Sequence, residues 1–369
     1  MSHFKANEPY NNLPLLPPSE DIETKVILKH CIEARTALAE LKQSASMLPN
    51  QAVLINTLPL LEAQASSEIE NIVTTTDKLF QYANKDNLQQ ANPSTKEALR
   101  YRTALRESFE SILKRPLNAS TAVKICSTIK GVDMEIRKVP GTSLENKQTE
   151  GIIYTPPVGQ DVLRGFLKNL DGFLHADDDL DPLIKMAIGH YQFEAIHPFT
   201  DGNGRTGRVI NILYLIDKGL LDIPVLYLSR YIIQNKTEYY SLLLGVTNGD
   251  SFEEWILYML KAIEETAKWT SAKIRAILSL MNDTRSFIKE NASQIYSHEL
   301  TDLLFVQPYC RIANVVDSNI AKRQTASEYL KKLVALGVLT EYQSGREKVF
   351  INPRFMKLLL NDGNSYKNF

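Results

Sequence analysis

The twelve residues HPFTDGNGRTGR, from His197 to Arg208, combine a possible base, an acid, a glycine-rich turn and two arginines. The stretch before them, DPLIKMAIGHYQFEAI, is apolar on broad faces and predicts a buried helix. Because proline disfavours helical geometry in the residue before it, Pro198 should end that helix at His197. The imidazole pKa lies near working pH, which suits His197 to act as a general base.

The turn after His197 has the composition of an anion-binding site. Two glycines around Asn203 allow positive φ, so successive N–H groups can point into one concavity beside the positive end of the next helix. Arg205 and Arg208 lie on one face of that helix's first turn, where two cations oppose the helix dipole unless a polyanion covers them. Since arginine suits bidentate phosphate contact, the pattern predicts a phosphate site.

Asp201 would be repelled by a phosphate unless a cation lies between them. Mg²⁺ bridging its carboxylate and the phosphates resolves that conflict, so Asp201 is the candidate metal ligand. Taken singly, a glycine-rich turn or a histidine is more often structural. Their coincidence within twelve residues favours a functional site.

HPFTDGNGRTGR resembles the signature of the Fic family, HxFx(D/E)GNGRxxR, at every defined position, and the resemblance extends over roughly residues 10–290. It implies a protein adenylyltransferase that transfers AMP from ATP to a Ser, Thr or Tyr hydroxyl of a target protein and releases pyrophosphate. It also implies that His197 deprotonates the hydroxyl and that Asp201 holds Mg²⁺ on the α- and β-phosphates. The implied ATP contacts are the anion hole of Gly202, Asn203 and Gly204, then Arg205, Thr206 and Gly207, and Arg208 on the γ-phosphate.

The segment from residue 136 to 157 has β-branched runs around turn residues and predicts a β-hairpin. It stands where the Fic family carries a target-docking flap. The resemblance implies that Ile152, Ile153 and Tyr154 lie along the cleft and hold the target backbone by strand addition. Tyr239 and Tyr240 match that family's paired tyrosines near the adenine. A plain surface hairpin and core packing of the tyrosine rings are the alternatives.

The segment SSEIEN at 66–71 resembles the inhibitory motif of the same family, [S/T]xxxE[G/N], in Ser66, Glu70 and Asn71. Ser66 and Glu70 are four residues apart and share one helix face. The resemblance implies that Glu70 pairs with Arg208 and keeps ATP from its productive position. Positioning a water for AMP removal is an alternative role for Glu70, and a solvated polar face is the structural alternative.

Apolar residues recurring near every 3.6 positions make the expected fold class mainly α. The resemblance implies a Fic helical bundle with a β-hairpin flap, and the order of elements near the C-terminus adds a winged-helix domain. We expect an N-terminal helical region with the inhibitory helix over 1–110, a Fic catalytic domain over 111–270, and a linker helix with the winged helix over 271–369. The predicted helices span about 21–48, 51–64, 66–83, 92–115, 119–130, 159–175, 181–196, 203–218, 235–248 and 251–290.

Residues 296–353 have the order of a winged helix: two short helices, the basic amphipathic segment KRQTASEYLKKLVALGVL, and a hairpin of VLTEY and EKVFIN. Lys322, Arg323, Lys331 and Lys332 suit a DNA-binding regulator, which is one rival function. Glu328 on the same helix favours a protein-interaction or dimerisation module instead. A homodimer is plausible for this family.

Other enzyme classes account for less of the pattern. The chain has no GxxxxGK[ST] loop, which argues against a P-loop enzyme. A metal hydrolase using His190, Glu194 and His197 would leave the glycines and arginines unexplained. A Fic enzyme that transfers a different phosphoryl-containing group is a closer rival, although Gly204 and both arginines favour ATP and AMP.

The bulk composition excludes several classes of protein. The 369 residues carry a formal net charge of −1, with 44% hydrophobic and 23% charged residues, which requires neither nucleic acid nor a membrane surface. Cys31, Cys126 and Cys310 are isolated, so neither a disulfide framework nor a structural zinc site is expected. The N-terminus lacks a signal-peptide pattern, and no run of about 18 apolar residues occurs. We therefore expect a cytoplasmic protein without a membrane partner.

Overall fold

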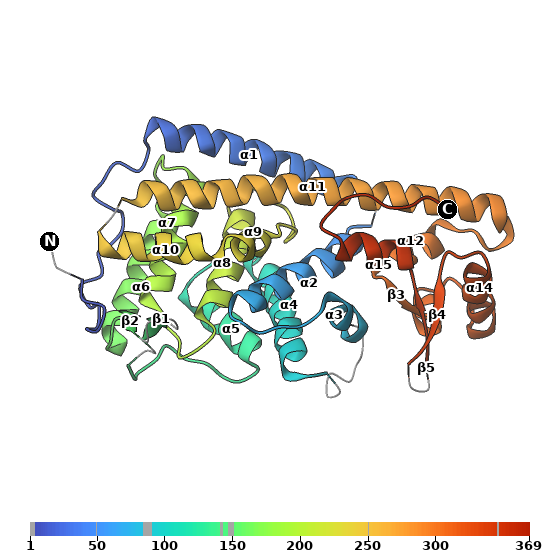
Figure 1. Cartoon of the computed structure of the whole chain (residues 1–369), viewed down its shortest axis with the longest axis horizontal. Coiled ribbons are helices and arrows are strands. Elements are labelled where there is room, and N and C mark those ends of the chain that lie inside the picture. The colour runs from blue at the N-terminus through green and yellow to red at the C-terminus, as the bar shows by residue number, and fades with distance from the viewer. Residues whose placement is uncertain are drawn as a thin grey trace.

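The computed structural model describes residues 4–48, 50–83, 91–140, 143–146, 151–249, 251–344 and 347–369. It is mainly helical with two small sheets, as predicted (Figure 1). Within these ranges, no helix has both the length and the apolar character needed to cross a bilayer.

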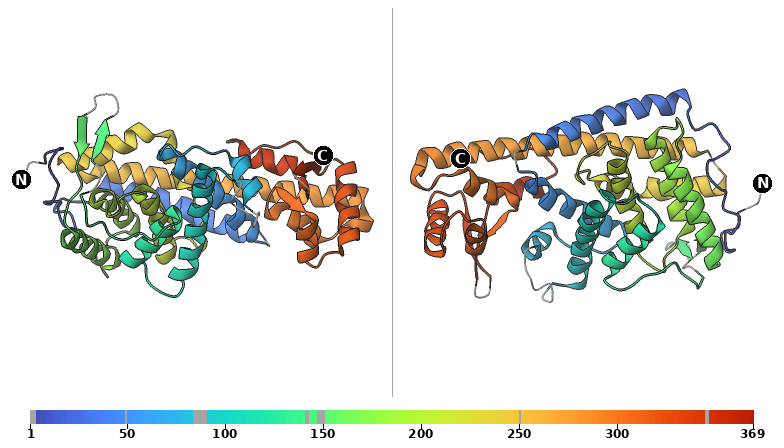
Figure 2. Two further views of the ribbon diagram at one scale, coloured as in Figure 1. Left: turned by 90° about the horizontal axis from the view of Figure 1, so that it is seen from below. Right: turned by 180° about the vertical axis from the view of Figure 1, so that it is seen from behind.

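Two long helices, α1 (Lys25–Ser46) and α11 (Phe252–Asn291), lie side by side along one face of the molecule (Figures 1 and 2). Each begins at a hydroxyl cap, because Thr24 accepts from the Ile27 amide and Ser251 accepts from the Glu253 amide. The two starts are also joined, since the Thr24 hydroxyl donates to Glu253 at 2.7 Å. The pair forms one wall against which helices from the middle of the chain pack.

The N-terminal region continues with α2 (Ala52–Ile69), α3 (Thr76–Tyr82), α4 (Pro93–Ile112) and α5 (Ala119–Lys130). The predicted break between residues 64 and 66 is wrong, because α2 runs unbroken through Ser66 and ends at Ile69. Asn71, with a φ of +61°, turns the chain away, and α3 restarts at Thr76 after the cap of Thr75. Ser66 and Glu70 therefore lie at the C-terminal end of a helix rather than at the start of one.

Five helices form the central bundle: α6 (Gln160–His175), α7 (Pro182–Ile196), α8 (Asn203–Asp217), α9 (Leu228–Gln234) and α10 (Lys236–Asn248). Four of them match predicted segments, and only the short α9 was missed. α7 and α8 are buried on almost every side, as their uniform apolar character predicts. Trp255 of α11 donates from its indole to the Ala187 carbonyl at 2.7 Å and fixes α7 against the long wall.

The predicted hairpin is confirmed as β1 (Leu144–Asn146) paired antiparallel with β2 (Gly151–Tyr154), and residues 147–150 between them lie outside the described residues. The chain's N-terminal segment packs beside the base of β2. The Tyr10 amide donates to the Thr155 carbonyl at 3.1 Å, and the ring of Phe4 stacks on that of Tyr154. The hairpin is thus held from outside as well as by its own strands.

The C-terminal region lies under the far end of α11 (Figures 1 and 2). Its helices and hairpin appear in the predicted order, but β3 and α15 were missed, and β3 extends the hairpin to a three-stranded sheet of order β3-β5-β4. α11 runs across residues 270 and 271, where one predicted domain boundary falls; the domain division and the winged-helix assignment stay predictions. The elements are η2 (Ser293–Ile295), α12 (His298–Val306), β3 (Tyr309–Arg311), α13 (Ile312–Asp317), α14 (Arg323–Ala335), β4 (Thr340–Ser344), β5 (Glu347–Ile351) and α15 (Pro353–Leu360).

The predicted basic residues of this region lie at the solvent surface. Lys322 caps α14, Lys331 and Lys332 lie further along it, and all three are exposed. Glu328 is exposed on the same helix. Surface exposure of these side chains suits either DNA binding or protein interaction, so DNA binding stays a prediction.

Candidate active site at the turn between α7 and α8

His197 ends α7 in a left-handed conformation, with a φ of +48°. Its Nδ1 lies 3.3 Å from the Glu194 carbonyl; since a carbonyl oxygen only accepts, Nδ1 carries the proton and Nε2 keeps its lone pair. Burial lowers the pKa of His197 to about 4. The hydrogen bond to the Glu194 carbonyl partly opposes this shift, and the positive charge of Arg137 lowers the pKa further. The imidazole is therefore neutral near pH 7 and has a free acceptor nitrogen.

The glycine-rich turn leads directly into α8. Gly202, with a φ of +87°, is the N-cap and has no side chain to bond the amides of the first turn, so these amides lack a side-chain partner. Asn203 holds the turn from within, because its side chain accepts from the Phe199 amide and donates to the Phe199 carbonyl, both at 2.8 Å. The helix N-terminus is thus built as an anion site, with Asn203 as its internal brace.

Arg208 is fully buried and binds the end of α2. Its Nε donates to the Ser66 hydroxyl at 2.8 Å, and its Nη2 donates to the Ser66 carbonyl at 2.9 Å and to Glu70 at 2.8 Å. Burial alone would raise the pKa of Glu70, but the charge and hydrogen bond of Arg208 outweigh it and hold that pKa below its usual value. Two of the three residues named from the motif SSEIEN, Ser66 and Glu70, therefore contact the last arginine of the signature. The Asn71 side chain instead accepts from Lys236 at 3.3 Å.

Gly204 explains how Glu70 comes so close to the turn. A Cβ on Gly204 would collide with Glu70 Oε1 and would lie 3.0 Å from Arg208 Nη1. The Glu70 carboxylate therefore rests directly on the first turn of α8. In this position it covers the place that an anion at the helix N-terminus would take.

Asp201 and Arg205 lie in a second charged cluster. Asp201 accepts from Lys130 at 2.5 Å and from Arg205 at 3.3 Å, and Glu97 of α4 pairs with both Arg205 and Lys130. The side chain of Asp201 is 58% exposed, so its carboxylate is accessible from solvent and suits Mg²⁺, which usually binds proteins through one or two carboxylates. Lys130 and Glu97 carry no local sequence signal, and sequence reasoning missed them.

A cavity of about 750 Å³, including its open mouth, brings most of the predicted site together. His197, Glu70, Gly204 and Arg208 line one side, and Leu144 lines it from β1. Four further predicted residues line it: Ile153 and Tyr154 from β2, and Tyr239 and Tyr240 from α10. The structure therefore places the predicted base, the predicted inhibitory glutamate, two residues of the predicted flap and both tyrosines around one cavity.

Eight of the predicted residues do not line this cavity: Ser66, Ile152, Asp201, Gly202, Asn203, Arg205, Thr206 and Gly207. Asp201 and Arg205 belong to the neighbouring charged cluster, and Ile152 is 41% exposed on the outer side of β2. Thr206 is fully buried. Gly207 serves helix packing, because a Cβ there would lie 2.7 Å from Glu194 Oε1.

Tyr239 and Tyr240 have different environments. Tyr239 is buried and its hydroxyl lies 2.8 Å from Nε2 of His190, whereas Tyr240 is 40% exposed and packs edge-on against Tyr239. Glu194 also lines the cavity, and its Oε1 is buried without a hydrogen-bond partner among the described residues. Burial raises the pKa of Glu194 to about 8.

The structure does not bring His190, Glu194 and His197 together as a metal-binding group. His190 and His197 direct ring nitrogens to Tyr239 and to a carbonyl. Across the described ranges, the one group of three such side chains close enough to share an ion is His30, Glu33 and Glu264, on the outer helices α1 and α11.

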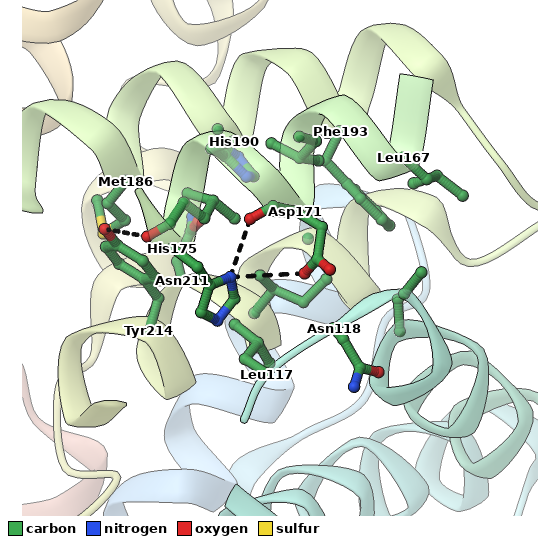
Figure 3. Close-up of a pocket in the computed structure, with 17 residues that line it drawn as sticks. Leu117, Asn118, Leu167, Asp171, His175, Met186, His190, Phe193, Asn211 and Tyr214 are labelled. Atoms are coloured by element: carbon green, nitrogen blue, oxygen red, sulfur yellow. Dashed lines mark hydrogen bonds and ion pairs between the residues drawn. The ribbon is translucent and has the colours of Figure 1, made fainter. Parts of the chain in front are cut away.

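A second cavity, of about 550 Å³, lies between α5, α6, α7 and α8 (Figure 3). Its lining is largely apolar, and His175 binds the Asp171 carbonyl there through Nδ1 at 2.9 Å. Of the signature residues, only Gly207 reaches it. The base, Arg208 and the flap all lie around the other cavity, so the chemistry of the signature belongs to that one.

Three family models match consecutive parts of the chain and together cover more than half of it. The Fic/DOC family N-terminal model matches residues 28–110, and the Fic/DOC family model matches residues 116–215. The C-terminal domain model of SoFic-like protein adenylyltransferases matches residues 280–355.

Curated relatives are similar over shorter stretches. The protein adenylyltransferase fic-1 of Caenorhabditis elegans is 27% identical over 160 residues, which are 43% of this chain and 29% of that protein. A probable protein adenylyltransferase of Aquifex aeolicus is 34% identical over 82 residues, 22% of this chain and 25% of that protein. The Drosophila melanogaster protein adenylyltransferase Fic is 25% identical over 194 residues, 49% of this chain and 38% of that protein. The chain thus spans well under half the length of these relatives.

Solved structures share the fold. A Fic family protein from Desulfovibrio desulfuricans superposes with a TM-score of 0.54 at 18% identity, covering 91% of this chain and 98% of that one. Fic-1 from Caenorhabditis elegans superposes with a TM-score of 0.52 at 17% identity, covering 69% of this chain and 75% of that one.

Proposed function

The chain belongs to the Fic/DOC family, and we propose that it is a protein adenylyltransferase that moves AMP from ATP to a Ser, Thr or Tyr hydroxyl of a target protein. The observation that carries the proposal is the cavity that joins a neutral His197, the first turn of α8 with its glycine N-cap and Arg208 beneath one hairpin. Relatives named as protein adenylyltransferases support it.

In the proposed reaction, His197 acts on the target side. Its Nε2 accepts the proton as the hydroxyl oxygen attacks the α-phosphorus, while the bond from that phosphorus to the β-bridging oxygen breaks and pyrophosphate leaves. The bond from Nδ1 to the Glu194 carbonyl keeps the ring in the tautomer that can accept this proton. Beginning from a neutral ring, His197 needs no prior deprotonation near pH 7.

The first turn of α8 acts on the nucleotide side. Its amides, which no N-cap side chain bonds, and Arg208 would stabilise the phosphate charge, and Arg205 supports the turn through its ion pair with Glu97. Asp201 would hold Mg²⁺, which supplies positive charge to the phosphates when bound. The chain's own contribution is thus to position the nucleotide and to keep fixed donors against it.

We further propose that Glu70 keeps this site mostly inactive. It occupies Arg208, which the γ-phosphate would need, and its carboxylate rests where phosphate oxygens would meet the α8 amides. ATP then binds without reaching the productive position. Because Glu70 and His197 line the same cavity, Glu70 could also position a water for AMP removal, the second activity that this arrangement allows.

The test uses ATP labelled at the α- or the γ-phosphate, incubated with the protein in cell extract. We expect α-label on protein with Glu70→Gly, little with the unaltered chain and none with His197→Ala. Glu68→Gly and His298→Ala are matched controls, because both side chains are exposed and away from the cavity. Labelling that survives His197→Ala, or transfer of the γ-label instead, would overturn the proposed reaction.

A further inference from the structure

Arg137, in the loop between α5 and β1, is a buried arginine that sequence reasoning did not single out; only 2% of it is exposed. Its guanidinium donates to main-chain carbonyls on both sides of the hairpin: to Val139 at 3.2 Å and to Pro157 at 2.5 Å. The same group donates to the last carbonyls of α7, those of Ile196 at 3.3 Å and His197 at 2.8 Å. One side chain therefore ties the base of the flap to the backbone of the candidate catalytic histidine.

The hydrogen-bond acceptors around the Arg137 guanidinium are backbone carbonyls. Across the described ranges, no carboxylate forms an ion pair with Arg137, and burial lowers its pKa. An unpaired buried charge is costly unless its donors are all used, so this position favours a group with many donors in a fixed plane. The carbonyls of Ile196 and His197 form the negative end of α7, where a cation is favourable.

The backbone of Arg137 adds a further bond to the same loop. Its amide donates to the Pro198 carbonyl at 2.9 Å, so contacts from one residue surround His197 on both sides along the chain. His197 has a φ of +48°, a left-handed conformation that non-glycine residues adopt only when the surroundings hold it. Removing the guanidinium would release both the flap base and this conformation together.

We propose that Arg137 is a positioning residue that fixes His197 relative to the flap, so that a hydroxyl held by the flap meets the imidazole. The inference rests on the proposed function. A second hydrogen bond between the hairpin and the end of α7 supports the inference, because the Tyr154 hydroxyl of β2 donates to the Ala195 carbonyl at 2.6 Å. The flap is thereby joined to the last turn of α7 at two adjacent places.

The proposed nucleotide-binding residues that the structure describes share no hydrogen bond with Arg137. No hydrogen bond joins Arg137 to Gly204, Arg208 or the α8 amides among the described residues. Loss of Arg137 should therefore slow transfer to the target without weakening ATP binding. A general structural defect would instead reduce both.

The experiment compares Arg137→Ala and Arg137→Lys in a Glu70→Gly background, using the full chain. Lys138→Ala is the matched control, because the neighbouring Lys138 is exposed and pairs with Glu135 at the surface. The readouts are kcat for α-label transfer and the Kd for ATP from calorimetry. We expect kcat to fall at least about tenfold for Arg137→Ala and less for Arg137→Lys, with the Kd for ATP within about twofold.

Added guanidinium chloride, at concentrations too low to unfold the chain, supplies a further readout. We expect it to restore part of the rate of Arg137→Ala, while ammonium chloride at equal concentration does not. Unchanged kcat in both variants, or a loss of ATP binding as large as the loss of kcat, overturns the inference. If Glu70→Gly itself transfers no α-label, the proposed function has failed instead, so the two failures are distinguishable.

Discussion

The two arginines of the signature differ in how firmly their glutamate partners are held. Both are buried, with 2% of Arg205 and 1% of Arg208 exposed, and each pairs with a glutamate from the N-terminal region. Glu97, the partner of Arg205, lies within α4, which continues to Ile112 and packs against α2, α5 and α8. The Arg205 pair is therefore enclosed by continuous helix.

The partner of Arg208 is less firmly held. Glu70 follows the last residue of α2, and Asn71 then leaves the helix at a φ of +61°. Glu70 also lines the cavity, so its carboxylate has open space on one side. The comparison teaches that the same pair of residue types has two roles: Glu97 with Arg205 stabilises the turn, and Glu70 with Arg208 forms a contact that can be released.

The largest effect should come from breaking the enclosed pair. Glu97→Ala leaves buried Arg205 with Asp201, at 3.3 Å, as its one carboxylate partner among the described residues, so we expect the free energy of unfolding to fall by about 3 kcal/mol. Glu70→Ala should cost less, about 1–2 kcal/mol, because Arg208 keeps both of its hydrogen bonds to Ser66. Urea denaturation of the two variants measures the difference. Equal losses in both would refute the distinction.

The next effect concerns activity rather than stability. Releasing Arg208 by Glu70→Gly should raise α-label transfer about tenfold or more, since the arginine and the α8 amides become free for phosphate. It should also increase the rise in Tm that ATP produces, because ligand binding stabilises the folded state. Calorimetric scanning with and without ATP checks this, with Glu68→Gly as control. An ATP-induced shift no larger than that of the unaltered chain would show that Glu70 does not restrain the site.

The residues that could be predicted from sequence are those whose meaning is local. His197, the glycines and Arg208 are close neighbours along the chain, so proline, glycine and charge rules describe them together. The helical fold followed from periodicity for the same reason. Glu70 was found only through resemblance to a family motif, since it is 138 residues from Arg208.

The missed residues depend on packing between distant segments. Lys130 meets Asp201 across 71 residues, and Arg137 meets His197 across 60. Nothing near Arg137 distinguishes it from a surface arginine, because its acceptors are backbone carbonyls, which every residue has. The wrong break in α2 has a similar origin: the local signal near Ser66 was polar, but the helix is buried on nearly all sides and continues.

A smaller effect is expected at the contact between Glu70 and the turn. In a Glu70→Gly background, Gly204→Ala places a methyl group 3.0 Å from Arg208 Nη1, at the surface that phosphate should meet. We expect ATP binding to weaken about fivefold, corresponding to about 1 kcal/mol of steric cost. Gly165→Ala is the control, because a Cβ there has no neighbour within 4 Å. Calorimetry gives both Kd values, and equal affinity would place the phosphates elsewhere.

The smallest effect, and the sharpest test of the His197 side of the site, is in the pH dependence. Burial places the pKa of His197 at about 4, so the base is already neutral at about pH 5, and kcat/KM should change less than twofold between about pH 5.5 and pH 7. Glu194, with a pKa of about 8, stays protonated across this range and does not obscure the result. The same pKa shift affects stability. Below the unfolded-state pKa near 6.5, the unfolded chain binds a proton that folded His197 does not. The contribution of His197 to the free energy of unfolding therefore falls as the pH drops toward 4. A rate that is half-maximal near pH 6.5 would mean that His197 titrates as an exposed histidine, and that the Arg137 side of the site does not hold it as the geometry indicates.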